Sequence, residues 1–67
     1  MTFRRFILTA EVTDDPRGDF IQDARSEIEA GRFWKRGKEL AGINSILDRV
    51  VRETGLEVYE EWRSSRA

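Results

Sequence analysis

The helix start that organises this chain is Asp14-Asp15-Pro16-Arg17-Gly18-Asp19-Phe20-Ile21-Gln22-Asp23-Ala24-Arg25. Asp15 stands where an N-cap residue is expected, because its side-chain oxygen can accept a hydrogen bond from a backbone N–H of the first turn. Pro16 follows at the first helical position, where its missing N–H costs nothing and its fixed φ is already helical. Asp19 adds negative charge near the positive end of the helix dipole.

The residues that follow complete this central helix. Phe20, Ile21, Ala24 and Ile28 recur at helical spacing and form one apolar face. Gly31 is a plausible stop just past the last helical residue. We therefore predict a helix over Pro16–Ala30. Gly18 weakens its first turn, and a close approach of another backbone segment is one physical reason for a glycine there.

The motif Asp15-Pro16-x-Gly18-Asp19-Phe20-Ile21-x-Asp23-Ala24 resembles the second helix of the YozE-like family, small bacterial proteins with a sterile-alpha-motif-like helical fold. In that family a short aromatic helix comes first, as Phe3-Arg4-Arg5-Phe6-Ile7-Leu8 does here. A Phe-Pro pair then follows the second helix and a Trp stands late in the chain, where this sequence has Phe33 and Trp62. The sequence departs from the pattern at Trp34, which replaces the Pro, and near Gly31, which looks like an insertion. The resemblance implies an all-α fold and little about activity.

Composition favours one small domain spanning residues 1–67. The chain has 37% charged residues with a net charge of only −1, which is typical of a solvated helical surface and unlike a uniformly basic nucleic-acid binder. It has no Cys and no His, so we expect no disulfide, no zinc or other metal site and no cofactor. Its apolar run near the N-terminus is too short for a signal peptide or a membrane span, so we expect a cytoplasmic protein.

The segment before the central helix has two interpretations. Phe3, Phe6, Ile7 and Ala10 recur at helical spacing, and Thr2 can cap such a helix. Within Phe3–Val12, apolar and polar residues also alternate as they do in a strand. The family resemblance favours the helix.

Two more helices are expected after the central one. Glu39-Leu40-Ala41 can form a short helix that stops near Gly42, and Ser45 begins a capping box for a longer helix over Ser45–Trp62. Gly55 divides that longer helix if it acts as a stop, although the apolar stripe continues across it. We predict a break or kink at Gly55.

The predicted fold is an all-α bundle of four or five short helices, sterile-alpha-motif-like. We expect its core to comprise ten apolar residues: Phe6, Phe20, Ile21, Ile28, Leu40, Ile43, Leu47, Val51, Val58 and Trp62.

The most suggestive candidate site is the basic–aromatic segment Arg32–Lys38. Four cations, Arg32, Lys35, Arg36 and Lys38, flank Phe33 and Trp34. Such cations can neutralise phosphates while aromatic rings stack on unpaired bases. The competing interpretation places Phe33 and Trp34 in the core, with the cations in solvent or paired with the acidic residues of the central helix.

A second candidate surface lies near the C-terminus. Leu56, Val58, Tyr59 and Trp62 form an apolar side that is wider than one helix stripe needs. Tyr and Trp are favoured anchors at protein interfaces. These residues either complete a core short of apolar material or dock a partner, with Trp62 favoured for the core.

No catalytic residues are predicted. Without His or Cys the chain lacks the commonest general base and the most reactive nucleophile. Asp19 and Asp23 lie one helical turn apart but fit a capping and solvated role.

We therefore expect a non-enzymatic protein-interaction module, a small regulator or adaptor that docks a larger protein or a second copy of itself. The expected contact residues are Phe33, Trp34, Lys35, Arg36 and Tyr59. The alternative is nucleic-acid binding through the four cations of Arg32–Lys38.

Overall fold

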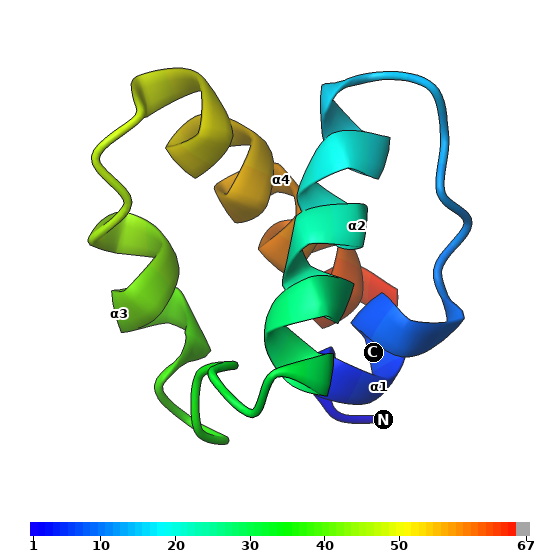
Figure 1. The fold of residues 1–67 in the computed structure, drawn as a ribbon, viewed down its shortest axis with the longest axis vertical. Coiled ribbons are helices and arrows are strands. Elements are labelled where there is room, and N and C mark those ends of the chain that lie inside the picture. The colour runs from blue at the N-terminus through cyan, green and yellow to red at the C-terminus, as the bar shows by residue number, and fades with distance from the viewer. Residues whose placement is uncertain (66–67) are drawn as a thin grey trace.

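The computed structural model describes residues 1–65 and contains four α-helices, with no strand among those residues. They are α1 (Phe3–Thr9), α2 (Pro16–Glu29), α3 (Glu39–Asn44) and α4 (Arg49–Ser65). Helix α2 packs against α1 on one side and α4 on the other, and α3 packs on α4 (Figure 1). The all-α prediction is therefore confirmed as a small four-helix bundle.

Helix α1 settles the choice between helix and strand at the N-terminus in favour of helix. The Thr2 side chain accepts a hydrogen bond from the Arg5 backbone N–H at 3.1 Å, which caps the first turn. At the other end the Arg25 guanidinium donates to the carbonyl oxygens of Ile7, at 3.0 Å, and Ala10. A side chain of α2 thus satisfies carbonyl groups at the end of α1, where the helix itself supplies no donors.

Helix α2 begins as its sequence predicts. The Asp15 carboxylate accepts a hydrogen bond from the Gly18 backbone N–H at 2.9 Å and another from the Thr13 hydroxyl at 2.6 Å. These two bonds, that of Thr13 first, lower the pKa of Asp15 because they stabilise its charged form. The helix ends at Glu29, and Gly31 follows with a φ of +75°, the left-handed conformation expected just after a helix.

Gly18 has the close backbone neighbour that its position suggested. A Cβ added to Gly18 would overlap the backbone of Thr13, lying 2.7 Å from the Thr13 nitrogen and closer still to its carbonyl oxygen. The turn before α2 therefore folds back onto the first turn of the helix, and only glycine leaves room for it.

The predicted helix Ser45–Trp62 is wrong at its start. Ser45 instead closes α3, donating its hydroxyl to the Gly42 carbonyl at 2.6 Å, and α3 continues through Gly42 to Asn44. Helix α4 begins later, at Arg49, where the Asp48 carboxylate accepts from the Val51 backbone N–H at 3.1 Å. A better-placed cap three residues downstream thus replaces the predicted capping box.

The predicted break at Gly55 is also wrong, because α4 continues through it. Gly55 is buried, and a Cβ there would lie 2.8 Å from the Phe20 ring and 3.0 Å from the Ile43 side chain. Its small size allows α2, α3 and α4 to meet closely at this point. Tertiary packing outweighs the cost of about 1 kcal/mol for glycine inside a helix.

The core contains eight buried apolar residues: Phe3, Ile7, Phe20, Ile21, Ala24, Ile43, Val58 and Trp62. Five of these were predicted, and Phe6 and Ile28 are partly buried against the same cluster. Three predicted core residues are exposed instead: Leu40 at 42%, Val51 at 39% and Leu47 at 97%. The buried face of α4 starts only at Gly55, so the apolar residues before it lie off the core.

Candidate functional site

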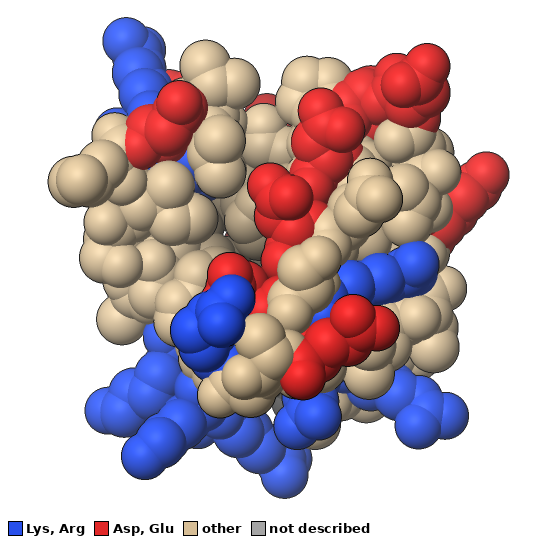
Figure 2. All heavy atoms as spheres, viewed as in Figure 1, with Lys and Arg blue, Asp and Glu red and all other residues tan. Residues whose placement is uncertain are grey.

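A groove runs along α2, on the side that faces α4 and the segment leading into it. It consists of two adjoining cavities of about 240 and 210 Å³, which share Phe20, Asp23 and Val51 as lining residues. The first cavity extends to Trp34 and the second to Pro16. Figure 2 shows this hollow between a tan surface, which has no charged side chains, and the acidic side chains that follow α2.

One bank of the groove is lined by Ile46, Val50 and Val51. The exposed Leu47 follows Ile46 in the chain and lies outside the lining of both cavities, and these four residues together are called the apolar ridge. Leu47 is 97% exposed and Val50 is 63% exposed, although both are purely hydrocarbon side chains. Ile46 is partly buried against the core and anchors the ridge. Ile46 and Leu47 precede α4, which starts at Arg49, and Val50 and Val51 lie in its first turn, before the part of the helix that packs on the core.

The other bank is an acidic row, formed by Asp19, Asp23 and Glu27 at four-residue spacing along α2. Glu27 forms an ion pair with Arg32 at 2.9 Å. Asp19 and Asp23 are exposed and take part in no ion pair within residues 1–65. Like charges one turn apart repel each other, so this bank would gain from a cation brought by another molecule.

The two rings of the basic–aromatic segment, Phe33 and Trp34, are half-buried. They are therefore neither fully in the core nor fully exposed for stacking on bases, the two placements that the sequence left open. The Phe33 ring stacks on the buried Phe3 ring with centroids 6.2 Å apart, and the Trp34 centroid lies 5.3 Å from that of Phe33. The Trp34 indole also covers Gly42, where a Cβ would overlap it. Trp34 therefore packs against α3 while part of its surface closes one end of the groove.

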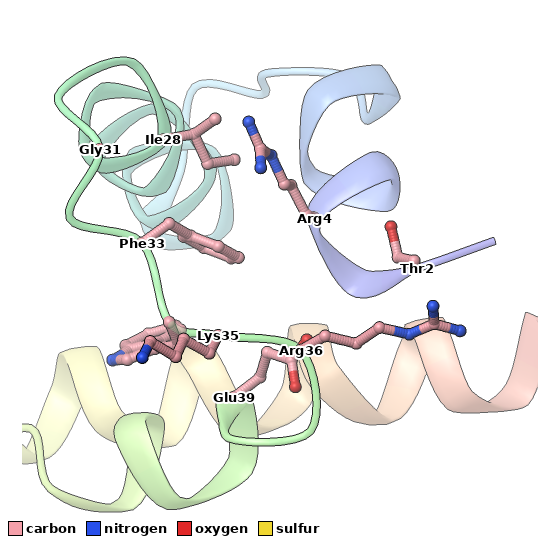
Figure 3. A pocket seen from close by; sticks show the side chains of 9 residues that line it. Thr2, Arg4, Ile28, Gly31, Phe33, Lys35, Arg36 and Glu39 are labelled. Carbon is pink, nitrogen blue, oxygen red and sulfur yellow. The ribbon is translucent and has the colours of Figure 1, made fainter.

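The cations of the same segment do not converge on one point. Phe33 projects into a third cavity of about 380 Å³, whose lining also includes Arg4, Lys35 and Arg36. Figure 3 shows Lys35 and Arg36 extending in opposite directions, with Arg4 reaching in from α1. Arg32 is tied to Glu27 by the ion pair described above, and that hydrogen bond raises the pKa of Arg32. The cations that line this cavity therefore extend in different directions, and they do not surround one common point where an anion would bind.

A buried carboxylate also reaches this third cavity. Glu39 is only 5% exposed, and it accepts a hydrogen bond from the Gly37 backbone N–H at 2.7 Å. Gly37 has a φ of +89°, so this bond holds a glycine turn of the basic–aromatic segment in place. The role of Glu39 that these contacts support is structural.

Tyr59 lies away from the groove, in an aromatic cluster. Its ring centroid is 5.3 Å from that of Phe3 and 5.3 Å from that of Trp62. Tyr59 is half-buried there, and it is joined to Phe33 only through Phe3. Of the predicted contact residues, the structure places Phe33 and Trp34 in the lining of the groove and Tyr59 beside the core.

Sequence reasoning missed the groove because it assigned two residues of the ridge, Leu47 and Val51, to the core. Ile46, Leu47, Val50 and Val51 form two adjacent apolar pairs, which is typical of a buried helical stripe. Only the start of α4 at Arg49 separates Leu47 from that stripe. The sequence feature that indicates this helix start is Asp48, a residue type that commonly caps a helix beginning just after it.

Comparison with known proteins adds no relative: no family model, no curated protein and no solved structure matches the chain. Within residues 1–65 no helix is long and apolar enough to cross a membrane. The same residues contain no cluster of three or more side chains suited to holding a metal ion.

Proposed function

We propose that this chain is a cytoplasmic, non-enzymatic protein-interaction module, a small regulator or adaptor that docks a larger protein through the groove and its apolar ridge. The observation that carries the proposal is the exposure of Leu47 at 97% beside Val50 at 63%. Fully burying one such side chain contributes about 1.5–3 kcal/mol. A partner that covers the ridge therefore gains a free energy that the isolated chain leaves unused.

The surroundings of the ridge support this proposal. Phe20 and Val51 line both cavities of the groove, so the surface is concave as well as apolar. Trp34 closes one end, and aromatic side chains of this kind are frequent anchors in interfaces. The absence of His and Cys from the whole sequence favours binding over catalysis. Membership of the YozE-like family, with its sterile-alpha-motif-like fold, is part of the proposal and rests on the motif Asp15–Ala24.

The test compares two matched pairs of surface changes. Leu47→Ser with Val50→Ser removes the two most exposed apolar side chains of the ridge, whereas Leu8→Ser with Val12→Ser changes an exposed Leu and Val in the same way elsewhere, at 44% and 42% exposure. Each tagged chain is expressed in cells that naturally make the protein, and captured partners are quantified by mass spectrometry. We expect the ridge pair alone to lose a partner, with circular dichroism showing that both variants stay folded.

Two results would contradict the proposal. One is that the ridge variant captures every protein that the unchanged chain captures. The other is that neither the unchanged chain nor the control captures any protein and light scattering shows a monomer, which also removes the homodimer version.

The second candidate function is nucleic-acid binding through Arg32, Lys35, Arg36 and Lys38. Lys and Arg side chains gather at one end of the molecule, and this favours an anionic partner there (Figure 2). Phosphate-driven binding weakens steeply with salt. Light scattering with mixed DNA and RNA at low and moderate salt tests it. A salt-sensitive mass increase that Lys35→Glu with Arg36→Glu abolishes would rank this function first.

A further inference from the structure

We propose that the occupant of the groove is an amphipathic helix of a partner protein that carries Lys or Arg along one edge. This inference rests on the proposed function and adds the chemistry of the partner. It follows from three properties of the groove: its length, the contrast between its banks, and the spacing of its free carboxylates.

The length of the groove suits a short helix. Its α2 bank runs from Pro16 to Glu27, which at a rise of 1.5 Å per residue is roughly 16 Å, or about three helical turns. A helix of that length presents apolar side chains at i, i+3 or i+4, and i+7 along one face. Strand addition is the other common mode of peptide docking, but it needs a sheet edge, and residues 1–65 form no strand.

The contrast between the banks orients the occupant. The apolar ridge can bury a hydrocarbon face, and the acidic row lies opposite it along the same hollow (Figure 2). A helix lying in this groove has its apolar stripe against Val50 and Val51 and one polar edge against α2. Lys and Arg suit that edge because their apolar stems follow the groove wall while their charged ends reach the carboxylates.

The spacing of the free carboxylates matches a helix. Asp19 and Asp23 are four residues apart on α2, so they lie roughly 6 Å apart along the helix axis. Two cations four residues apart on a partner helix have the same spacing. Glu27 is already paired with Arg32, so two carboxylates, and not three, remain to select the partner.

A second copy of this chain fits the groove less well. Its basic–aromatic segment lies between α2 and α3 and is not helical apart from isolated turns. Helix α1 does combine Arg4 and Arg5 with apolar residues, but Phe3 and Ile7 of that helix are buried in the core. The apolar face of the only strongly basic helix within residues 1–65 is thus already used.

A synthetic peptide probes the chemistry directly. It has about 18 residues, long enough for some helix in isolation, with Leu at i, i+3, i+4 and i+7, Lys along one edge of that apolar face and Gln elsewhere. A control peptide keeps every Leu and replaces Lys with Glu. Each is titrated into the full-length ¹⁵N-labelled chain, and the indole N–H resonances of Trp34 and Trp62 are followed.

We expect the Lys peptide to shift the Trp34 indole, which lines the groove, and to leave that of the buried Trp62 in place. Asp19→Asn with Asp23→Asn should weaken binding about tenfold, because both free carboxylates are lost. Glu29→Gln with Glu57→Gln removes two exposed carboxylates outside the groove and should leave the affinity unchanged. The Glu peptide should not bind.

Several results would overturn the inference. They are equal binding of the Glu peptide, resonance shifts spread over the whole chain, or equal weakening by the two carboxylate pairs. A dimer of the unchanged chain that Asp19→Asn with Asp23→Asn dissociates would make a second copy the occupant instead.

The cellular capture experiment separates this inference from the proposed function. A partner that is lost with Leu47→Ser and Val50→Ser but kept with Asp19→Asn and Asp23→Asn leaves the proposed function standing and refutes the cationic helix. A ridge variant that loses no partner refutes the proposed function itself, whatever the peptide does.

Discussion

The sharpest structural prediction concerns Gly18, because its neighbour is backbone and cannot rotate away. In Gly18→Ala the new Cβ would lie 2.5 Å from the Thr13 carbonyl carbon and 2.7 Å from its nitrogen, whereas ordinary contacts of a Cβ are 3.4–4 Å. Relief requires the turn before α2 to move away from the helix. That movement also pulls on the Thr13–Asp15 and Asp15–Gly18 hydrogen bonds, which hold the same turn.

Two opposing terms set the size of the effect. Replacing glycine by alanine inside a helix gains at most about 1 kcal/mol. Overpacking typically costs about 1–3 kcal/mol, and contact with fixed backbone belongs at the upper end of that range. We expect Gly18→Ala to lower the free energy of unfolding by about 2 kcal/mol. For a domain of this size that corresponds to a melting temperature lower by about 8–16 °C.

Thermal and urea unfolding, followed by circular dichroism, measure this change. Gly55→Ala is the matched comparison, because its Cβ would meet only side chains, at 2.8 Å from Phe20 and 3.0 Å from Ile43. Side chains can give by a few tenths of an ångström, so Gly55→Ala should cost less than Gly18→Ala. A Gly18→Ala variant as stable as the unchanged chain would refute the close approach of Thr13.

Three further predictions concern contacts between distant parts of the chain and the cap of α2. Asp15→Asn keeps a capping side chain but removes the charge. The pKa of Asp15 in the folded chain lies below its ordinary 3.8, so the charged carboxylate stabilises the fold. The unchanged chain should therefore be more stable than Asp15→Asn at neutral pH, and this difference should disappear as the pH falls through the folded pKa. The bidentate Arg17–Glu61 pair, at 2.7 and 3.0 Å, is partly exposed, so a double-mutant cycle with Arg17→Met and Glu61→Gln should give a coupling of about 0.5–1 kcal/mol that shrinks with salt. Trp62→Phe removes the indole N–H that donates to the Met1 carbonyl at 2.9 Å and should cost about 1–3 kcal/mol in urea unfolding.

Each of these predictions has a result that counts against it. An advantage over Asp15→Asn that persists undiminished well below pH 3.8 would mean that the charge of Asp15 does not stabilise the cap. A coupling between Arg17 and Glu61 near zero at low salt would make that pair incidental. A Trp62→Phe variant with unchanged stability would mean that the bond to Met1 contributes nothing.

Local signals in the sequence predicted the helix starts well where one side chain suffices. Thr2 and Asp15 each accept a hydrogen bond from a backbone N–H three residues later, as their residue types suggest. Such a cap depends only on neighbours in the chain, so the sequence contains the whole cause. The same reasoning made Ser45 the cap of the next helix and Asp48 the last residue of its capping box, whereas in the structure Asp48 is itself the cap.

The burial of side chains was predicted less well, because it depends on which other helices pack against a residue in the folded chain. Leu47 and Val51 continue the periodicity of Val58 and Trp62, yet only the latter two face α1 and α2 in the core. Gly55 was predicted as a break because glycine weakens helices. Its close contacts with Phe20 and Ile43 come from elements far away in sequence, and no local pattern contains them.

The candidate site was predicted in part. The sequence singled out Trp34, which the structure places at one end of the groove, and the acidic spacing of Asp19 and Asp23, which it places along one bank. The ridge opposite was missed for the reason that its residues look like core. A surface that resembles core in sequence and is exposed in the fold can be recognised only after the fold is known.

The start of α4 is where local preference and the fold disagree, and that disagreement supports a binding role for the ridge. Val50 and Val51 are β-branched, so they lose side-chain freedom in a helix, and at exposed positions of a first turn polar residues would stabilise the helix better. Neither residue repays this cost in the core, since the buried face of α4 begins at Gly55. Where a sequence breaks a local rule without a gain in folding, function is the expected reason. A partner that buried Leu47, Val50 and Val51 would supply the gain that the isolated chain lacks, and the neighbouring acidic row is the reason for the proposal that such a partner is positively charged there.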